Sequence, residues 1–308
     1  MNSQQAEFVI RNKCINCGSK HLNVLSSGSF NEEPIRTFIE DDPWGESPLP
    51  YLENERWVYV QCNECSQMFH SRILSPEWNE ILFSKWMTED AILSYEEKLN
   101  TPLRQFEKKK IYVEHVLRIE KKTRKIRENE SVRILDFGCG WGEFLAMCER
   151  FDFTVYGVDK SSARREAGQN VPILPRLDDI KQTKEGSLGF HAITLFEVLE
   201  HLDDPFSILQ ELSEYLVRDG ILVLETPNCT GTIGITSKTD YRHIHPLSHI
   251  NGFTPETLRS IAERAGFRSV KRDIAQVTCD GYRVAKREMK RLFSGILKPT
   301  TQQYFRKI

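Results

Sequence analysis

One segment of this chain restricts its fold more than any other. It is a short apolar stretch followed by a glycine turn and then by a helix-forming stretch. Val132–Phe137 is predicted to be a buried strand, Gly138, Gly140 and Gly142 form a G-x-G-x-G turn, and Glu143–Cys148 has the composition of a helix. Glycines let the backbone approach a ligand closely, and the first turn of a helix offers free N–H groups to an anionic group. This unit is typical of the doubly wound sheets that bind nucleotides.

The residues downstream of the turn continue the same pattern. Thr154–Val158 is predicted to be a second strand, and it ends at Asp159, where a carboxylate can accept hydrogen bonds from both hydroxyls of a ribose. Glu143 stands where a dinucleotide fingerprint has its third Gly or Ala, which argues against NAD. Further apolar strands separated by helical stretches are predicted at 171–174, 192–196 and 220–224. We therefore expect an α/β fold whose parallel sheet is buried on both faces.

Two CxxC pairs near the N-terminus predict a metal site. Cys14 and Cys17 form the first pair, Cys62 and Cys65 form the second, and segment 26–56 between them has the Pro, Gly and acidic residues of an inserted loop. Each pair follows a short strand-like run, so each can aim two thiolates at one point. Four such thiolates make a closed, structural zinc site. The alternatives are two unrelated reduced pairs or a redox CxxC.

Composition and charge narrow the class of protein. The 308 residues carry 42 Lys+Arg against 44 Asp+Glu, a net charge of −2, which argues against nucleic-acid binding as the main task. No apolar run is long enough for a membrane helix, and the N-terminus lacks a leader, so we expect a cytoplasmic protein. The expected organisation is a zinc-ribbon-like lobe over 1–75, a helical linker over 76–130 that includes a long helix over 103–127, and a nucleotide-binding domain over 131–308.

Five motifs, taken in order, resemble the class I S-adenosylmethionine-dependent methyltransferases, and in particular the ubiquinone-pathway O-methyltransferases. They are LDFGCGWGEFL, YGVDKS, FEVLEHLDDP, GILVLETPN and HPLSHINGFTPETLRSIAERAGF. The four-cysteine lobe resembles that of a subset associated with glycan and secondary-metabolite modification. The resemblance implies a Rossmann-like sheet whose last, antiparallel strand is Gln302–Lys307. Residues 280–300 would then be an insertion before that strand.

The resemblance also implies the residues that hold S-adenosylmethionine. The methionine end would lie against Asp136 and the three glycines of the turn, and the ribose against Asp159. Leu177 and Asp178 would flank the adenine. Phe196 and Glu197 would border the methyl group and the acceptor.

Acid–base and metal chemistry has two candidate sources. Glu197, Glu200 and His201 have the i, i+3, i+4 spacing at which some ubiquinone-pathway relatives hold a divalent cation, so Mg²⁺ is a candidate ligand there. The alternative is that Glu197 orients the cofactor, Glu200 stabilises a helix start and His201 borders the acceptor cleft. His201, His245 and His249 are the candidates for a base that deprotonates the acceptor.

The expected function is therefore methylation of a small molecule, with a hydroxyl of a sugar or sugar-like metabolite as the preferred acceptor. One alternative is an RNA methyltransferase that uses the basic stretches near residues 101–131 and 271–308. The acidic N-terminal lobe argues against it. A second alternative is a non-catalytic scaffold that has lost cofactor binding, which the intact glycine turn and Asp159 disfavour.

Overall fold

The computed structural model describes residues 5–127, 129–168, 170–273, 282, 285, 286, 289 and 301–308. The basic insertion expected over 280–300 therefore lies almost entirely outside the described residues. The chain separates into two compact units, each assembled from three stretches. Unit 1 comprises Met1–Thr101, Glu200–Pro205 and Pro227–Thr257, and unit 2 comprises Pro102–Leu199, Phe206–Thr226 and Leu258–Ile308. The domain boundaries expected at residues 75 and 130 stay predictions.

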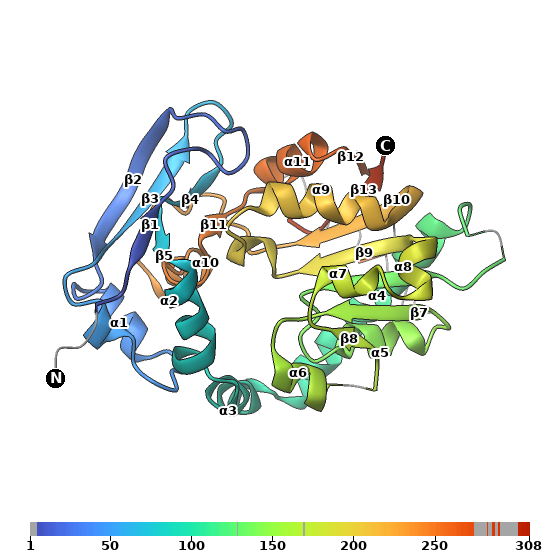
Figure 1. Ribbon diagram of the computed structural model, residues 1–308, viewed down its shortest axis with the longest axis horizontal. Helices are drawn as coiled ribbons and strands as arrows, with labels where there is room; N and C mark the ends of the chain where they lie inside the picture. Colours follow the sequence, from blue (N-terminus) through green and yellow to red (C-terminus); the bar gives the residue numbers. More distant parts are fainter. Residues whose placement is uncertain are drawn as a thin grey trace. The chain divides into compact units, whose positions relative to one another are not determined.

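Unit 2 is built on one twisted sheet, which in the described residues has seven strands in the order β12-β13-β10-β9-β6-β7-β8 (Figure 1). All neighbours from β10 to β8 are parallel, whereas β13 is antiparallel to both of its neighbours. The strands are β6 (Arg133–Phe137), β7 (Thr154–Val158), β8 (Ile173–Leu174), β9 (Phe190–Phe196), β10 (Leu216–Glu225), β12 (Phe267–Val270) and β13 (Gln303–Lys307). This topology confirms the doubly wound α/β fold and the antiparallel last strand.

Helices connect these strands. The elements are α4 (Pro102–Thr123), α5 (Glu143–Glu149), α6 (Ser162–Ala167), α7 (Leu177–Ile180), α8 (Lys184–Leu188), the 3₁₀ turn η3 (Leu199–His201), α9 (Pro205–Tyr215) and α11 (Pro255–Arg264). The long helix expected over 103–127 is α4, which ends at Thr123. Among the described residues, no helix combines the length and the apolar character needed to cross a bilayer.

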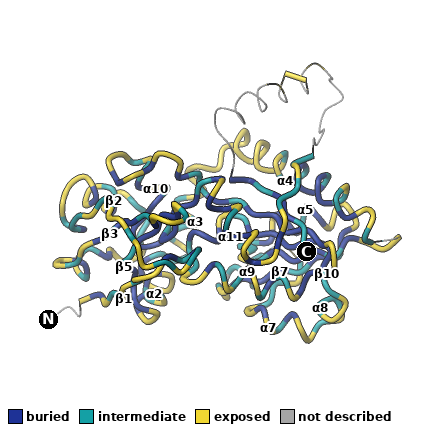
Figure 2. Tube along the Cα trace, turned by 90° about the horizontal axis from the view of Figure 1, so that it is seen from above, coloured by how far each residue is buried: buried dark blue, intermediate teal, exposed yellow. Residues whose placement is uncertain are grey.

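The strands of unit 2 are apolar on both faces, as expected for a sheet covered by helices. Ile134, Ile193 and Leu222 have no exposed surface, and the central strands form a continuous buried band in Figure 2. The chain runs from β6 outward to β8 and then returns to β9 on the other side of β6. The strand order therefore reverses between β6 and β9, and ligands of doubly wound folds bind at the carboxyl ends of the strands at such a point.

Unit 1 contains a four-stranded antiparallel sheet with the order β11-β4-β3-β2 and a separate β1-β5 pair (Figure 1). The strands are β1 (Phe8–Ile10), β2 (Leu22–Ser29), β3 (Arg56–Cys62), β4 (Met68–His70), β5 (Arg72–Leu74) and β11 (Asn251–Gly252). The helical elements are α1 (Ile35–Glu40), η1 (Leu49–Tyr51), α2 (Pro76–Ile81), the π-helical η2 (Leu82–Trp86), α3 (Glu89–Leu99) and α10 (Lys238–His243). Segment 26–56 is thus more than a loop, because it completes β2 and forms α1.

The N-terminal lobe shares its core with residues that follow β10. Strand β11 pairs with β4, and the partly buried Arg11 guanidinium donates to the carbonyls of His70 and Ile250 and to Asn251 Oδ1 at 2.6 to 3.0 Å. Tyr241 packs in the same buried cluster as the aromatic side chains of the lobe. Residues 227–257 are therefore part of the lobe's own packing.

Candidate functional site

The glycine turn lies at the carboxyl end of β6 and takes a left-handed conformation at all three glycines, with φ of 75°, 55° and 72° for Gly138, Gly140 and Gly142. A Cβ at Gly138 would stand 2.5 Å from Val198 Cγ2, and one at Gly142 would stand 2.7 Å from Val171 Cγ2. At Gly140 no heavy atom of the described residues lies within 4 Å of the Cβ position. Two glycines are therefore required by packing, and the middle one leaves open space in which a ligand can approach the backbone.

Asp159, one residue beyond β7, lies beside the turn and is held by the backbone. Its Oδ2 accepts the Gly140 N–H at 2.9 Å and its Oδ1 accepts the Ser161 N–H at 3.0 Å. Arg164 Nη1 stands 3.9 Å from Oδ2. These contacts fix the carboxylate next to the open space at Gly140, as a ribose-binding residue requires.

Asp136 lies within β6, beneath the turn, and only 3% of its surface is exposed. Its Oδ1 accepts the Thr194 hydroxyl at 2.6 Å. Burial, together with the nearby charge of Asp159, raises the pKa of Asp136 to about 7, against the effect of the Thr194 hydrogen bond. The carboxyl group is positioned to support the turn, and its contact with the cofactor stays a prediction.

The residues expected near the adenine begin α7. Leu177 is buried, and its carbonyl accepts the Tyr215 hydroxyl at 3.2 Å. The Asp178 carboxylate is exposed and lies 3.4 Å from Arg176 Nη2 and 3.3 Å from Lys181 Nζ. Their role toward the adenine stays a prediction.

The end of β9 carries an aromatic cluster that sequence reasoning found only in part. The Phe196 ring lies 5.0 Å from the Phe144 ring and 4.7 Å from the His115 ring, centroid to centroid. Glu197 has a φ of 55°, and its N–H donates to the Glu225 carbonyl at 2.8 Å. The sequence analysis did not single out His115, because a single histidine in the helix that became α4 carries no motif.

His245 is held through both ring nitrogens. Its Nδ1 accepts the Leu247 N–H at 3.1 Å, and its Nε2 lies 2.8 Å from the Tyr241 hydroxyl and 3.3 Å from Asp42 Oδ2. The Tyr241 hydroxyl also donates to Asp42 Oδ2 at 2.5 Å. Hydrogen bonds from His245 and Tyr241 hold the pKa of the Asp42 carboxyl below its usual value, against the effect of burial. Asp42 belongs to segment 26–56, where no motif marked it.

The other two candidate histidines meet Glu200. One ligand atom each from Glu200, His201 and His249 lie within 4.8 Å of one another, and Glu200 is 1% exposed. His201 Nδ1 lies 2.8 Å from the Ser248 carbonyl, and this contact leaves Nε2 of that ring with the lone pair. Among the described residues, His249 Nδ1 is buried without a hydrogen-bond partner. Glu197 is not part of this group, so the set expected for Mg²⁺ differs from the set that the fold assembles.

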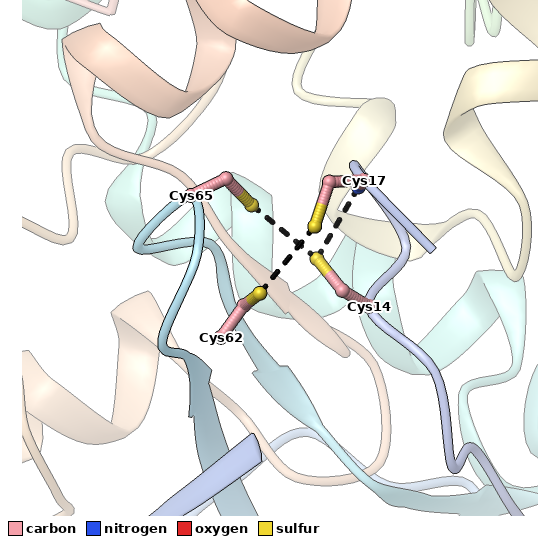
Figure 3. Close-up of side chains that lie close together, drawn as sticks. All are labelled: Cys14, Cys17, Cys62 and Cys65. Atoms are coloured by element: carbon pink, nitrogen blue, oxygen red, sulfur yellow. Dashed lines mark hydrogen bonds between the residues drawn. The ribbon is translucent and has the colours of Figure 1, made fainter. Parts of the chain in front are cut away.

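The four cysteines of unit 1 converge (Figure 3). Cys14 Sγ lies 3.5 Å from Cys65 Sγ, and Cys17 Sγ lies 3.4 Å from Cys62 Sγ. The N–H groups of Asn16 and Cys17 point to Cys14 Sγ at 3.4 Å. Thiolates bound to one zinc ion at about 2.3 Å stand about 3.8 Å apart, so the donor set fits zinc. The clustering agrees with the prediction from the spacing.

A protein-family model described as "Methyltransferase domain" matches residues 104–272, from α4 to β12. The chain belongs to the methyltransferase-domain family. The match spans more than half of the chain, and it includes the glycine turn, Asp159 and the carboxyl ends of β9 and β10.

Curated relatives of the methyltransferase domain are ubiquinone biosynthesis O-methyltransferases. The protein from Actinobacillus pleuropneumoniae serotype 5b is 32% identical over 133 residues, which are 40% of this chain and 57% of that protein. The mitochondrial protein from Schizosaccharomyces pombe is 30% identical over 143 residues, 44% of this chain and 52% of that protein. The chain thus spans about half the length of the curated relatives it matches.

Solved structures to which this chain is similar include two methyltransferases. A SAM-dependent methyltransferase from Archaeoglobus fulgidus has a TM-score of 0.39 and 22% identity over 61% of this chain and 90% of its own. The plantazolicin methyltransferase BpumL in complex with a triazolic desmethylPZN analog and SAH has a TM-score of 0.45 and 16% identity over 75% of this chain and 94% of its own. Family membership rests on the family model.

Proposed function

We propose that this protein transfers a methyl group from S-adenosylmethionine to a small-molecule acceptor. The observation that carries this proposal is the open space at Gly140 beside the fixed carboxylate of Asp159. Both lie where the order of parallel strands reverses, in a chain of the methyltransferase-domain family. A left-handed glycine with room for a ligand, next to a ribose-binding carboxylate, is the arrangement that an adenosine cofactor needs.

The residues of unit 2 divide the work of binding. Asp159 hydrogen-bonds the ribose, the backbone at Gly138, Gly140 and Gly142 receives the methionine end, and α7 borders the adenine. The cofactor supplies an activated methyl group on its sulfonium, so the chain has to orient the two reactants and exclude water. The rings of Phe196 and Phe144 supply an apolar wall for this purpose.

For the acceptor we propose a hydroxyl group of a sugar or another small metabolite. The names of the relatives describe O-methyl transfer in ubiquinone biosynthesis by those proteins. The near-neutral net charge of −2 supports a small acceptor over a nucleic acid. That His201, His245 or His249 acts as a base stays a prediction. Both ring nitrogens of His245 already have partners, so this side chain suits a positioning role better than proton transfer.

Two metal sites belong to this proposal. Cys14, Cys17, Cys62 and Cys65 hold a structural zinc ion. Glu200, His201 and His249 hold a divalent cation, and their two nitrogen donors suit Mn²⁺, Fe²⁺ or Zn²⁺ better than Mg²⁺. Such a cation lowers the pKa of a hydroxyl that binds it.

The test of methyl-donor binding is calorimetric titration with S-adenosylhomocysteine, the product form of the cofactor. We expect one site per chain, and Asp159→Ala should weaken binding by about 1.5–3 kcal/mol, the scale of a charge-assisted hydrogen bond. Glu149→Ala is the control, because this carboxylate is exposed at the end of α5 and has no part in the proposed binding site. Wild-type protein that does not bind the nucleoside would overturn the proposed function.

A further inference from the structure

Glu225 ends β10 at the edge of the sheet where ligands of doubly wound folds bind. It is paired in register with Phe196 on the neighbouring parallel strand β9. Both side chains contact the His115 ring, so they lie on the same face of the sheet. Because Phe196 is expected to border the transferred methyl group, Glu225 stands beside the reaction centre. The sequence analysis did not assign it a role.

The carboxylate of Glu225 is held rigidly by neutral partners. Gln302 Nε2 lies 2.7 Å from Glu225 Oε2 and also 2.7 Å from His115 Nε2, so the amide N–H₂ group bridges the two side chains. Accepting that N–H leaves the His115 proton on Nδ1, which is 2.8 Å from the Tyr304 hydroxyl. His115 is 1% exposed, and burial lowers its pKa, so the ring is neutral at pH 7. The bridging network therefore orients the negative charge of Glu225 without neutralising it.

The charge of Glu225 remains available to a ligand. Burial acts to raise the pKa of this carboxyl, but the hydrogen bond from Gln302 and the positive charge of Arg272 hold it below its usual value, so the group is ionised at neutral pH. Arg272 acts on it through space, whereas the buried Arg118 pairs with Glu114 at 3.0 Å. The contacts to Gln302 and His115 both fall on Oε2, and 32% of the side chain is exposed. Oε1 can therefore face a bound molecule.

The surroundings of Glu225 select the chemistry of its ligand. A fixed carboxylate next to the His115 ring, which packs on the Phe196 and Phe144 rings, favours a cation, because ring faces attract positive charge as well. An aliphatic ammonium group satisfies the carboxylate with a charge-assisted hydrogen bond and leaves its carbon chain against the rings. A neutral hydroxyl would give the carboxylate only an ordinary hydrogen bond, which is weaker than a charge-assisted one.

We propose that Glu225 binds an aliphatic ammonium group at the carboxyl edge of the sheet, with His115 and Gln302 as positioning residues. This inference rests on the proposed function and deepens it. Two molecules of the reaction can bring such a group: the cofactor, through the amino group of its methionine part, and an acceptor that carries an amine. The experiment separates these two sources.

The first arm compares S-adenosylhomocysteine with its deaminated analogue by calorimetry. Glu225→Gln should weaken binding of S-adenosylhomocysteine at least tenfold and leave the analogue unchanged if the cofactor supplies the ammonium group. Glu225→Asp, which keeps the charge, should retain part of the affinity. Glu149→Gln, at an exposed carboxylate in α5, is the matched control and should change neither value. Thermal unfolding of each variant verifies the fold.

The second arm titrates glucosamine and glucose into protein saturated with S-adenosylhomocysteine. If the acceptor supplies the ammonium group, wild-type protein should prefer glucosamine at least tenfold, and Glu225→Gln should lose this preference. A Glu225→Gln variant that matches wild type for both nucleosides, together with no preference for glucosamine, would overturn the inference. Failure of wild-type protein to bind S-adenosylhomocysteine would instead overturn the proposed function itself, and this inference with it.

Discussion

In unit 2 the strands near the glycine turn bury mainly aliphatic side chains, with Asp136 and Thr194 as exceptions, whereas the core of unit 1 combines aromatic rings with His70 and packs beside a partly buried Arg11. Ile134 and Leu222 have no exposed surface and need no polar partner. In unit 1, His70 is fully buried, its Nε2 lies 2.8 Å from the Ile244 carbonyl, and burial lowers its pKa to about 3. The partly buried Arg11 guanidinium lies among three carbonyl and amide oxygens, and its removal from water lowers its pKa to about 10.

This contrast indicates different sources of stability. Unit 2 gains from burying apolar surface that each strand brings with it. Unit 1 depends in addition on hydrogen bonds that His70 and Arg11 make to residues far away in the sequence, and on the four cysteines. Buried polar groups cost free energy when their partners are lost. A single substitution should therefore unfold a larger part of unit 1 than of unit 2.

Removal of zinc should produce the largest difference in stability between the two units. Cys62→Ser should remove the bound zinc and unfold the cysteine-containing part of unit 1, because structural zinc sites contribute on the order of 10 kcal/mol in small domains. Hydrogen–deuterium exchange should show lost protection in β3 and β4 and retained protection in β6 and β9.

Cys229→Ser is the control for the zinc experiment, because Cys229 is a buried cysteine of unit 1 outside the cluster. Elemental analysis should give one zinc ion more per chain in wild-type protein and in this control than in Cys62→Ser. Equal loss of protection in both units of Cys62→Ser would contradict the contrast, and absence of zinc from wild-type protein would contradict the site.

The buried carboxyl of Asp136 should make the stability of unit 2 depend on pH. Its folded-state pKa is about 7 against an ordinary value of 3.8. A raised pKa means that the protonated form stabilises the fold fully below about pH 4, and that this contribution is lost as the pH rises through about 7. The change is about 1.4 kcal/mol for each pKa unit.

Asp136→Asn should remove this dependence. Denaturant unfolding between pH 4 and 8 should show wild-type protein losing stability relative to the variant. Parallel pH profiles of the two proteins would show that Asp136 is ionised in both the folded and the unfolded chain.

The cluster of Glu200, His201 and His249 in unit 1 offers a third comparison. His249→Ala should weaken binding of Mn²⁺ on the order of 100-fold, since it removes one of three ligand atoms. Electron paramagnetic resonance of added Mn²⁺ measures the free ion. The control is His243→Ala, a neighbouring histidine outside the cluster. Equal Mn²⁺ affinity in wild type and His249→Ala would remove the cation site from the proposal.

Two glycines with the same backbone strain provide the smallest and sharpest test. Gly140 in unit 2 and Gly231 in unit 1 have φ of 55° and 84°, and neither Cβ position has a heavy atom of the described residues within 4 Å. Alanine at either position should destabilise its unit by about 1–2 kcal/mol. Only Gly140→Ala should also weaken the binding of S-adenosylhomocysteine, by about 30-fold or roughly 2 kcal/mol. Equal nucleoside affinity in the two variants would place the cofactor elsewhere.

The residues themselves were enough to predict the sheet of unit 2. Apolar strands at regular spacing, the glycine turn and Asp159 are local patterns, because strand burial and left-handed glycines act within a few residues. The cysteine cluster could also be predicted, since tetrahedral zinc ligation requires two pairs with short internal spacing. Helix α4 was expected to reach residue 127 and ends at Thr123, because helix ends depend on neighbouring contacts.

The tertiary structure alone decided which side chains meet across long stretches of chain. Asp42 reaches His245 and Tyr241, His249 replaces Glu197 beside Glu200, and His115 joins Glu225 and Gln302. No spacing rule connects such residues, because they are far apart in the sequence. Periodicity predicts only which neighbouring residues share a face of a helix or strand. The sequence by itself therefore determined the scaffold and the cofactor turn. Only the tertiary structure determined which groups pair with the buried charges of the chain. Burial in a low dielectric requires an oriented partner for each charge.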